Sequence, residues 1–273
     1  MKEVVVVTGL GTMGLACARR LGSGRRLVIT DVDGRRVDEA ATTLRDDGLD
    51  VVSCVLDLGD PAAPQALADA VAGAGGLKTL VHTAAISQAQ APSAEKIFEV
   101  NMVGTARLLE AFLPLAGPGS VGVVIASMGA QFVQLTPEVE RAFALAPLDA
   151  LMGAVRTVPA WDDKSNAYLV AKRGNQVRVE VQSLAWARQG ARLVTISPGL
   201  TSTAQGRLEL KEHPQVAAVL AGTPMQRIGT PDDIASAVEW VSGPSASFVT
   251  GIDLRVDGGT IAALRWGQLG VSA

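Results

Sequence analysis

Several residue types that build common functional sites are scarce in this sequence. Among its 273 residues only two are cysteine, two are histidine and one is tyrosine, and aromatic residues make up 4 % of the chain. Cys17 and Cys54 are far apart, and neither has a second cysteine or a histidine cluster at metal-binding spacing. We therefore expect no disulfide and no metal centre, and we interpret both residues as buried thiols of a reducing compartment.

A strong charge of either sign is missing as well, and so is any long apolar run. The formal net charge is −3 and the pI is near 5.5, whereas a nucleic-acid-binding surface needs a basic face. No window of about 18 residues is apolar and free of glycine or charge, so no membrane span is expected. The opening MKEVVVVTG is too short and too β-branched for a signal peptide. We expect a soluble, cytoplasmic protein with no nucleic-acid or membrane partner.

Short runs of apolar, β-branched residues recur along the chain, and helix-length stretches separate them. Most of these runs are apolar throughout, which is typical of strands buried on both faces of a parallel sheet. They begin at Val4, Arg26, Val51, Thr79, Gly122, Ala191 and Gly251. Because strands and helices alternate without a linker or a repeat, we expect one doubly wound α/β domain over residues 1–273.

The segment TGLGTMG after the first run carries Gly9, Gly11 and Gly14 in the spacing GxGxxG. Such glycines permit a tight turn, let a pyrophosphate approach backbone N–H groups and let a helix pack against the strand. The spacing alone is not specific, but here a strand precedes it and a helix follows it, as a dinucleotide site requires. We therefore expect this turn, with Thr12 and Met13, to contact a dinucleotide.

Asp31 ends the second run, twenty residues after Gly11. A carboxylate in that place accepts hydrogen bonds from both ribose hydroxyls of NAD and repels the 2′-phosphate of NADP. The alternative interpretation is a helix-capping aspartate in DVDG, a part that Asp33 could also fill. Arg35 and Arg36 could bind a 2′-phosphate. NAD is therefore the expected cofactor, and NADP the less favoured one.

Four residues with ordinary structural explanations stand in chemically suggestive places. Ser127 ends the fifth run at the carboxyl edge of the sheet, where open α/β sheets place their ligands. Asn101 lies between apolar residues of a helix-length stretch. Tyr168, the single tyrosine, precedes Lys172 by one helical turn in SNAYLVAK. Taken singly, each could be a cap, an exposed helix residue or a surface pair.

Taken in order, these motifs resemble the short-chain dehydrogenase/reductase family, in its compact single-domain branch. The resemblance covers nearly the whole chain and rests on the glycine turn, VNMVG around Asn101, Ser127, YLVAK, SPG and VDGG. It implies a Rossmann fold with a parallel sheet of about seven strands in the order 3-2-1-4-5-6-7. It also implies an oxidoreductase that forms homodimers or homotetramers through the helices bearing Asn101 and Tyr168.

The same resemblance implies a role for each of the four residues. Tyr168 would be the general acid/base. Because a free phenol has a pKa of about 10, the positive charge of Lys172 would be needed to favour its phenolate. Lys172 would also hold the nicotinamide ribose, and Ser127 would hydrogen-bond the substrate oxygen. Asn101 would hold the water through which protons reach solvent.

Further cofactor contacts are expected after other strands. Thr201 and Thr203, behind Pro198-Gly199, would grip the carboxamide and the phosphates. An ordinary loop aspartate is the alternative interpretation of Asp57. The remaining expected cofactor residues follow the second, third and fourth runs: Val32, Asp57, Leu58, Thr83, Ala84 and Ala85.

Two motifs depart from the family's usual pattern. TGLGTMG is one residue shorter between its outer glycines than the usual TGxxxGxG. His82-Thr83-Ala84-Ala85 replaces the usual NNAG and is similar to the sugar-nucleotide epimerases and dehydratases. An enzyme of that kind is one alternative function, and a catalytically silent NAD-sensing protein is another. We interpret His82 as a structural strand residue and His213 as an exposed one.

The largest departure is the distance of 41 residues from Ser127 to Tyr168, which exceeds the family's usual short spacing. It predicts an insertion over residues 129–163 beside the active site. Apolar faces in such a segment either cover the substrate or form a subunit contact. A similar segment occurs in the hydroxysteroid dehydrogenase/carbonyl reductase group, which favours an apolar, steroid-like secondary alcohol or ketone as substrate.

The insertion itself has helix signals. TPEVERAFAL combines a Thr-Pro start and an acidic first turn with Val139, Phe143 and Leu145 at helical spacing. A second helix could begin at Pro147. The other variable wall is residues 201–228, which we expect to form a mobile substrate loop.

Overall fold

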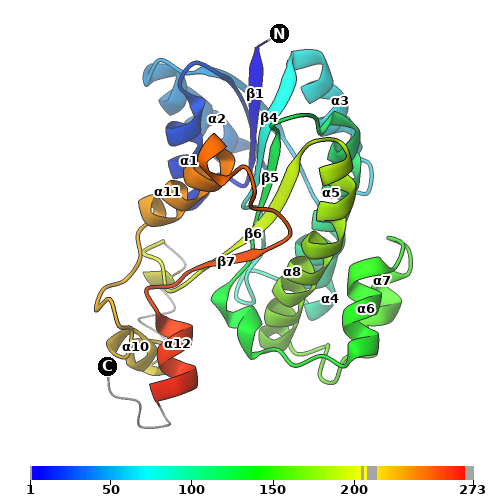
Figure 1. Cartoon of the computed structure of the whole chain (residues 1–273), viewed down its shortest axis with the longest axis vertical. Coiled ribbons are helices and arrows are strands. Elements are labelled where there is room, and N and C mark those ends of the chain that lie inside the picture. Colours follow the sequence, from blue (N-terminus) through cyan, green and yellow to red (C-terminus); the bar gives the residue numbers. More distant parts are fainter. Residues whose placement is uncertain (1, 204–205, 208–213, 268–273) are drawn as a thin grey trace.

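One parallel sheet forms the centre of the computed structural model, which describes residues 2–203, 206–207 and 214–267 (Figure 1). Its order is β3-β2-β1-β4-β5-β6-β7, and every strand pair is parallel. The predicted α/β class and strand order are therefore confirmed. The strands are β1 (Glu3–Thr8), β2 (Arg26–Asp31), β3 (Asp50–Val55), β4 (Gly76–His82), β5 (Val121–Ile125), β6 (Arg192–Pro198) and β7 (Asp253–Val256).

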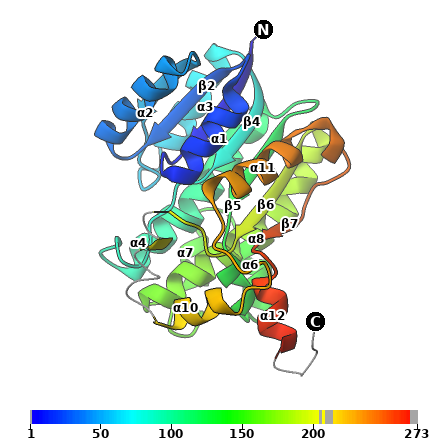
Figure 2. The same cartoon turned by 90° about the vertical axis from the view of Figure 1, so that its left-hand side faces the viewer.

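Helices cover both faces of this sheet, as Figures 1 and 2 show from two sides. The helices α1, α2 and α11 lie on one face, and α3, α5 and α8 lie on the other. The α-helices are α1 (Thr12–Gly22), α2 (Gly34–Asp46), α3 (Ala63–Ala74), α4 (Ala94–Phe98), α5 (Thr105–Phe112), α6 (Pro137–Leu145), α7 (Leu151–Val155), α8 (Lys164–Arg188), α10 (Pro214–Ala221), α11 (Pro231–Ser242) and α12 (Thr260–Trp266). Shorter helical turns are η1 (Glu99–Gly104), η2 (Leu113–Leu115), η3 (Met128–Phe132) and η4 (Pro244–Ala246).

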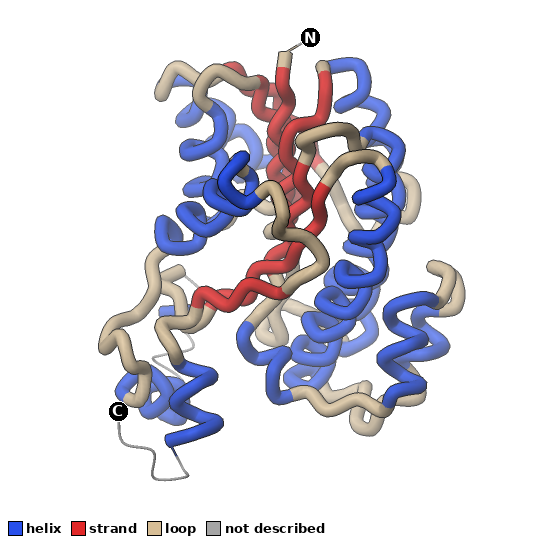
Figure 3. The backbone as a smooth tube through the Cα atoms, in the orientation of Figure 1, coloured by secondary structure: helices blue, strands red, loops and turns tan. Residues whose placement is uncertain are grey.

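The central strands are buried on both faces, as their unbroken apolar runs predict. In β1 successive side chains alternate between two cores, with Val5 and Val7 packing toward α1 and α11 and Val4 and Val6 packing toward α3 and α5. Figure 3 shows the strands as one twisted layer between the helices. The edge strand β3 differs, because Val55 is 60 % exposed. Burial on both faces therefore holds for the inner strands and fails at this edge, which has no second neighbour.

The helix-length stretch 94–112 folds as α4, η1 and α5 in direct succession. Its middle part, η1, is a π-helical turn that contains Asn101. Such turns are rare and often lie at functional sites, because the extra residue redirects the local hydrogen bonds. The sequence predicted the helical stretch but not this local widening.

The insertion forms α6, which packs against α8 of the same chain, and α7, which packs against α6 and η1. Thr136 caps α6 through Val139 N, and Pro137 occupies its first turn, as the Thr-Pro signal predicts. The second helix begins at Leu151, later than the expected Pro147. Buried Arg178 on α8 donates 3.1 Å hydrogen bonds to the carbonyl oxygens at the end of α6. These bonds anchor the insertion to α8.

Two expectations fall partly or wholly outside the described residues. His213 lies outside them, and so do parts of the expected substrate loop 201–228. Within the described ranges, no helix has both the length and the hydropathy needed to cross a membrane.

Candidate active site

The glycine turn between β1 and α1 is shaped by contacts that exclude side chains. Gly9 has φ +87°, and a Cβ there would lie 2.5 Å from the backbone nitrogen of Ala84. A Cβ on Gly14 would lie 1.9 Å from the carbonyl oxygen of Gly9. A Cβ on Gly11 would meet nothing within 4 Å. The protein itself therefore requires two of the glycines, and the third borders open space where a phosphate group could approach the backbone.

Thr83 and His82 hold this turn from the end of β4. The hydroxyl of Thr83 lies 3.0 Å and 2.8 Å from the carbonyl oxygens of Thr8 and Gly9. His82 is buried, and its two ring nitrogens bond the hydroxyls of Thr8 and Thr105. Burial, with a smaller contribution from the charge of Lys172, lowers the pKa of His82 to about 3. His82 is therefore neutral and joins β1 to α5, which agrees with its interpretation as a structural residue.

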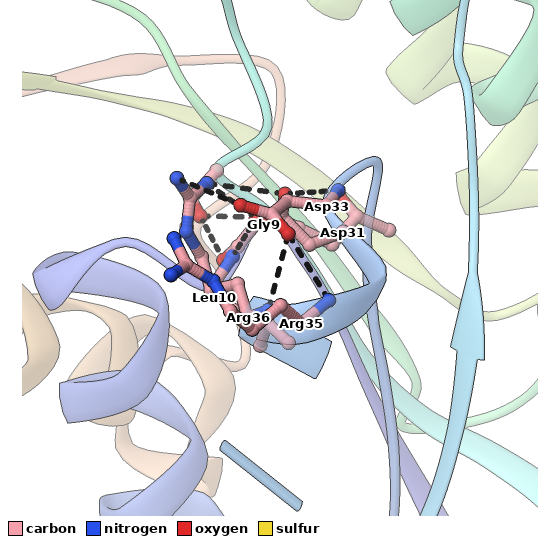
Figure 4. A network of polar contacts seen from close by, with 8 residues as sticks. Gly9, Leu10, Asp31, Asp33, Arg35 and Arg36 are labelled. Atoms are coloured by element: carbon pink, nitrogen blue, oxygen red, sulfur yellow. Dashed lines mark hydrogen bonds and ion pairs between the residues drawn. The ribbon is translucent and has the colours of Figure 1, made fainter. Parts of the chain in front are cut away.

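Asp31 lies at the end of β2 with its carboxylate directed at the glycine turn (Figure 4). Its Oδ2 accepts the N–H of Leu10 at 2.7 Å, and its Oδ1 accepts the N–H of Asp33 at 3.1 Å. Arg36 Nη1 donates to both oxygens, at 3.1 Å and 3.2 Å. Asp33 caps α2 through the N–H groups of Arg35 and Arg36. Asp33 is therefore the residue that caps α2. The carboxylate of Asp31 binds the glycine turn instead.

Three of the expected cofactor residues, which follow β2 and β3, differ in their exposure. Val32 is 60 % exposed, so its side chain is available to a flat ligand. Leu58 is buried among the residues between the sheet and α5. Asp57 is exposed and accepts the N–H of Gly59 at 2.7 Å in a local turn. Of these three, Val32 has the most free apolar surface next to Asp31.

The end of β5 brings Ser127 to the same region as the Tyr168 helix. Ser127 is half-buried and caps η3 by accepting the N–H of Gly129 at 3.2 Å. The turn that follows packs on α8, because a Cβ on Gly129 would lie 2.6 Å from Leu169. Lys172 Nζ donates to the carbonyl oxygen of Ile125, the last residue of β5, at 2.8 Å. The structure therefore brings Ser127, Tyr168 and Lys172 to the carboxyl edge of β5.

Lys172 is a buried cation beside the tyrosine ring. Its ammonium nitrogen lies 5.7 Å from the centroid of the Tyr168 ring, and the residue is 3 % exposed. Burial lowers the pKa of Lys172 to about 8, because a medium with little water disfavours the charged form. At neutral pH the lysine is still mostly protonated, and its field reaches Tyr168 with little screening by solvent.

Asn101 is bonded at every polar group of its side chain. Its Oδ1 accepts the N–H of Ile86 and its Nδ2 donates to the carbonyl oxygen of Ile86, both at 2.8 Å. Its own carbonyl oxygen accepts hydrogen bonds from Thr105 and from Asn175 on α8. Asn101 thus ties the loop after β4 to the helix that carries Tyr168. Its expected water-holding role stays a prediction.

The loop after β6 places its predicted cofactor residues at the same edge. Pro198 ends β6, and a Cβ on Gly199 would lie 2.6 Å from Cα of Asp257. The hydroxyl of buried Thr201 donates to the carbonyl oxygen of Gly199 at 3.0 Å, and Thr203 Oγ1 accepts the N–H of Gly206. Both hydroxyls thus stabilise the loop itself, and their contacts to a cofactor remain a prediction.

Two polar residues on α8 support the site and were not identified from the sequence. Asn175 bonds Asn101, and Gln176 Nε2 bonds both Ser197 on β6 and Asp253 on β7. Burial raises the pKa of Asp253, although the hydroxyl of Ser197 donates to it. The spacing could have identified them, because these residues follow Lys172 by three and four positions and share its helix face. In the part of the chain described, no His, Cys, Asp and Glu residues gather into a metal-binding group.

Burial of Lys172 predicts a pH-dependent cost in stability. In the unfolded chain the lysine stays protonated up to its ordinary pKa of 10.5, whereas the folded value is about 8. Between these two values the unfolded state binds more protons, so the cost is full below pH 8 and is relieved as the pH rises toward 10.5. The advantage of Lys172→Met over the wild type in free energy of unfolding should therefore shrink, by up to about 1.4 kcal/mol per pH unit.

Urea denaturation at intervals from pH 7 to pH 9.5 measures this difference, with Lys164→Met as a matched control because Lys164 is exposed. The control should differ from the wild type by a constant amount. If the free energies of unfolding of wild type and Lys172→Met changed in parallel with pH, Lys172 would have the same pKa in the folded and unfolded states, which would contradict the prediction.

Comparison with known proteins finds similarity over nearly the whole chain. Residues 3–136 match the family model described as short chain dehydrogenase, and residues 150–260 match the one described as Enoyl-(Acyl carrier protein) reductase. The chain is 32 % identical to the short-chain dehydrogenase/reductase bsc3 of Alternaria brassicicola, over 96 % of this chain and 97 % of that protein. It is 28 % identical to the 3-alpha-hydroxysteroid dehydrogenase/carbonyl reductase of Comamonas testosteroni, over 96 % and 98 % of the two chains.

Its structure is similar to the crystal structure of gox2181, with a TM-score of 0.76, 27 % identity and 96 % coverage of each chain. The two family models together extend over most of the chain, and the relative from Alternaria is similar over nearly the full length of both proteins. The chain belongs to the short-chain dehydrogenase/reductase family, whose members are oxidoreductases that use NAD or NADP.

Proposed function

We propose that this oxidoreductase interconverts a secondary alcohol and a ketone, with NAD(H) as its preferred cofactor and an apolar substrate. The observation that carries the proposal is the buried ammonium of Lys172 beside the ring of Tyr168, next to the end of β5 where Ser127 stands. An acid/base group with a cation held in a dry environment beside it suits proton transfer to or from a substrate oxygen.

The glycine turn and Asp31 are the residues that would hold the cofactor. Gly11 borders open space and is the N-cap of α1, and helix N-termini favour phosphate groups. Asp31 accepts the N–H of Leu10 in the same turn. Thr12, Met13 and Gly14 continue the turn into α1. When bound, the nicotinamide would accept or supply the hydride.

Tyr168 would donate its phenolic proton to the carbonyl oxygen in reduction and remove the alcohol proton in oxidation. Charged Lys172 favours the phenolate, because opposite charges a few ångströms apart interact strongly where solvent is excluded. The hydroxyl of Ser127 would donate to the same substrate oxygen and stabilise its growing negative charge. Asn101 and Asn175 would hold η1 at a constant distance from α8, the helix that carries Tyr168 and Lys172.

The surroundings of Tyr168 support an apolar substrate. Tyr168 packs at the border of an apolar cluster to which the insertion contributes Val133, Leu135 and Trp161. Phe132, five residues after Ser127, is 55 % exposed. A side chain of this kind at the edge of a site gains free energy when an apolar ligand covers it. The relative from Comamonas, whose name includes 3-alpha-hydroxysteroid dehydrogenase, favours the same class.

A screen of apolar ketones with NADH and NADPH, and of the matching alcohols with the oxidised cofactors, tests this proposal by absorbance of the reduced nicotinamide. We expect turnover with cyclic ketones and little with open-chain sugar alcohols. Tight binding of NAD without any net turnover would instead favour the epimerase-type or NAD-sensing alternatives. We further propose a single cytoplasmic domain that assembles as a homodimer or homotetramer, which size-exclusion chromatography with light scattering would test.

Part of the surface of α8, one of the helices through which the resemblance implies assembly, is covered within the chain. Val170 and Val177 are buried in the cluster shared with α6 and α7, whereas Leu184 near the end of the helix is 61 % exposed. An assembly through this region would therefore involve the outer surface of the insertion or the last turns of α8.

A further inference from the structure

Arg36 occupies the side of Asp31 that a ribose would need. The carboxylate of Asp31 has room for about four hydrogen bonds. Two are used by the backbone N–H groups of Leu10 and Asp33, which cannot leave without moving the glycine turn or α2. The other two are used by Nη1 of Arg36, which contacts both carboxylate oxygens. Among the described residues Arg36 is the one side chain that donates to Asp31.

The neighbouring Arg35 is placed differently. Its side chain is 83 % exposed and its nearest carboxylate partner is Glu39, at 4.0 Å. Arg36 is 47 % exposed, and its guanidinium also lies 3.8 Å from Asp33. Figure 4 shows Arg36 and the amide of Leu10 meeting at Asp31. The two adjacent arginines thus separate cleanly into one that touches the candidate ribose ligand and one that does not.

We propose that Arg36 is a specificity-determining residue that weakens the binding of NAD(H) and strengthens the binding of NADP(H). Arg36 thereby reduces the factor by which the protein prefers NAD(H) over NADP(H). The inference rests on the proposed dinucleotide site. A ribose diol that bonds both oxygens of Asp31 must displace Arg36 from them, so the ion pair competes with NAD(H).

A 2′-phosphate has the opposite relation to the pair. It is repelled by the carboxylate of Asp31, but a guanidinium released from Asp31 can bind it through two parallel hydrogen bonds. Because about half of the Arg36 side chain already faces solvent, its guanidinium can move from Asp31 to the phosphate without a change in the core. Asp33, which stays beside Arg36, keeps the released guanidinium near the cap of α2.

Binding titrations with the purified full-length protein test the inference without relying on turnover. Dissociation constants for NADH and for NADPH are measured by isothermal titration calorimetry for wild type, Arg36→Met, Arg36→Lys and Arg35→Met. Methionine keeps much of the length of the arginine side chain and removes its charge. We expect Arg36→Met to bind NADH about threefold more tightly, since an ion pair of this exposure is weak.

The same variant should bind NADPH about tenfold more weakly, because a charge-assisted bond to phosphate is lost. Arg36→Lys should keep part of the NADPH affinity, and Arg35→Met should match the wild type with both cofactors. Unchanged affinities in Arg36→Met, or a parallel loss for both cofactors, would overturn the role of Arg36 while leaving the dinucleotide site in place. A wild-type protein that binds neither cofactor would overturn the proposed function itself.

Discussion

A Tyr168→Phe variant is expected to lose about 10³-fold in kcat while its dissociation constant for NADH stays within about twofold of wild type. The substitution removes one oxygen and keeps the ring, so the packing of residue 168 against the buried apolar cluster remains. The lost atom is the one that would exchange a proton with the substrate oxygen. Stopped-flow measurement of NADH oxidation, combined with a calorimetric titration of NADH, separates the two effects.

Lys172→Met provides the companion measurement. It removes the buried charge beside the ring, so kcat should fall although the phenolic hydroxyl is still present. Thermal melting of both variants must first show that each is folded. Turnover close to wild type in Tyr168→Phe, with any substrate that the screen yields, would contradict the assignment of Tyr168 as acid/base.

A second large effect is expected at the glycine turn, where substitutions three residues apart should have different consequences. In Gly14→Ala the new methyl group would overlap the carbonyl oxygen of Gly9, at a distance of 1.9 Å. This overlap can be removed only if the turn or α1 shifts, so we expect the free energy of unfolding to fall by about 3 kcal/mol. Urea denaturation in the absence of any dinucleotide measures this loss.

Gly11→Ala is the matched variant, because its methyl group would meet no protein atom within 4 Å. Gly11 has φ −66° and ψ 178°, a conformation that alanine adopts without strain. Stability should therefore stay within about 0.5 kcal/mol of wild type, while NADH should bind at least about tenfold more weakly because the methyl group occupies the approach to the backbone. Normal NADH affinity in Gly11→Ala would place the phosphates elsewhere.

The insertion has a structural role, because α6 packs against the helix that carries Tyr168. Phe143 is fully buried against α8, and Arg178 binds the carbonyl oxygens of Phe143 and Ala146 while pairing with Glu110 on α5. These contacts fasten α6 to the helix that carries Tyr168. The first part of the insertion, with Val133 and Leu135, lies in the same cluster as the tyrosine ring. The segment thus supports α8 and packs against the same apolar cluster as Tyr168.

Much of the frame follows from patterns that are local in the chain. The unbroken apolar runs predict buried parallel strands, and the observed sheet has the expected order. The Thr-Pro signal predicts the start of α6. Local patterns were less accurate at element ends, since β4 begins at Gly76 instead of Thr79 and α7 at Leu151 instead of Pro147. End positions depend on neighbouring strands and caps as well as on the residues of the element itself.

The sequence by itself determined the class of fold, the glycine turn and the pairing of Tyr168 with Lys172, because each of these depends on spacing within one or two adjacent elements. Only the tertiary structure decided which groups form hydrogen bonds and ion pairs with one another. Lys172 donates to Ile125, Asp31 bonds Leu10 and Arg36, and His82 joins Thr8 to Thr105. Most of these partners lie far apart in the chain. Their hydrogen bonds and altered pKa values arise from burial and direction, which exist only after the strands and helices have packed together.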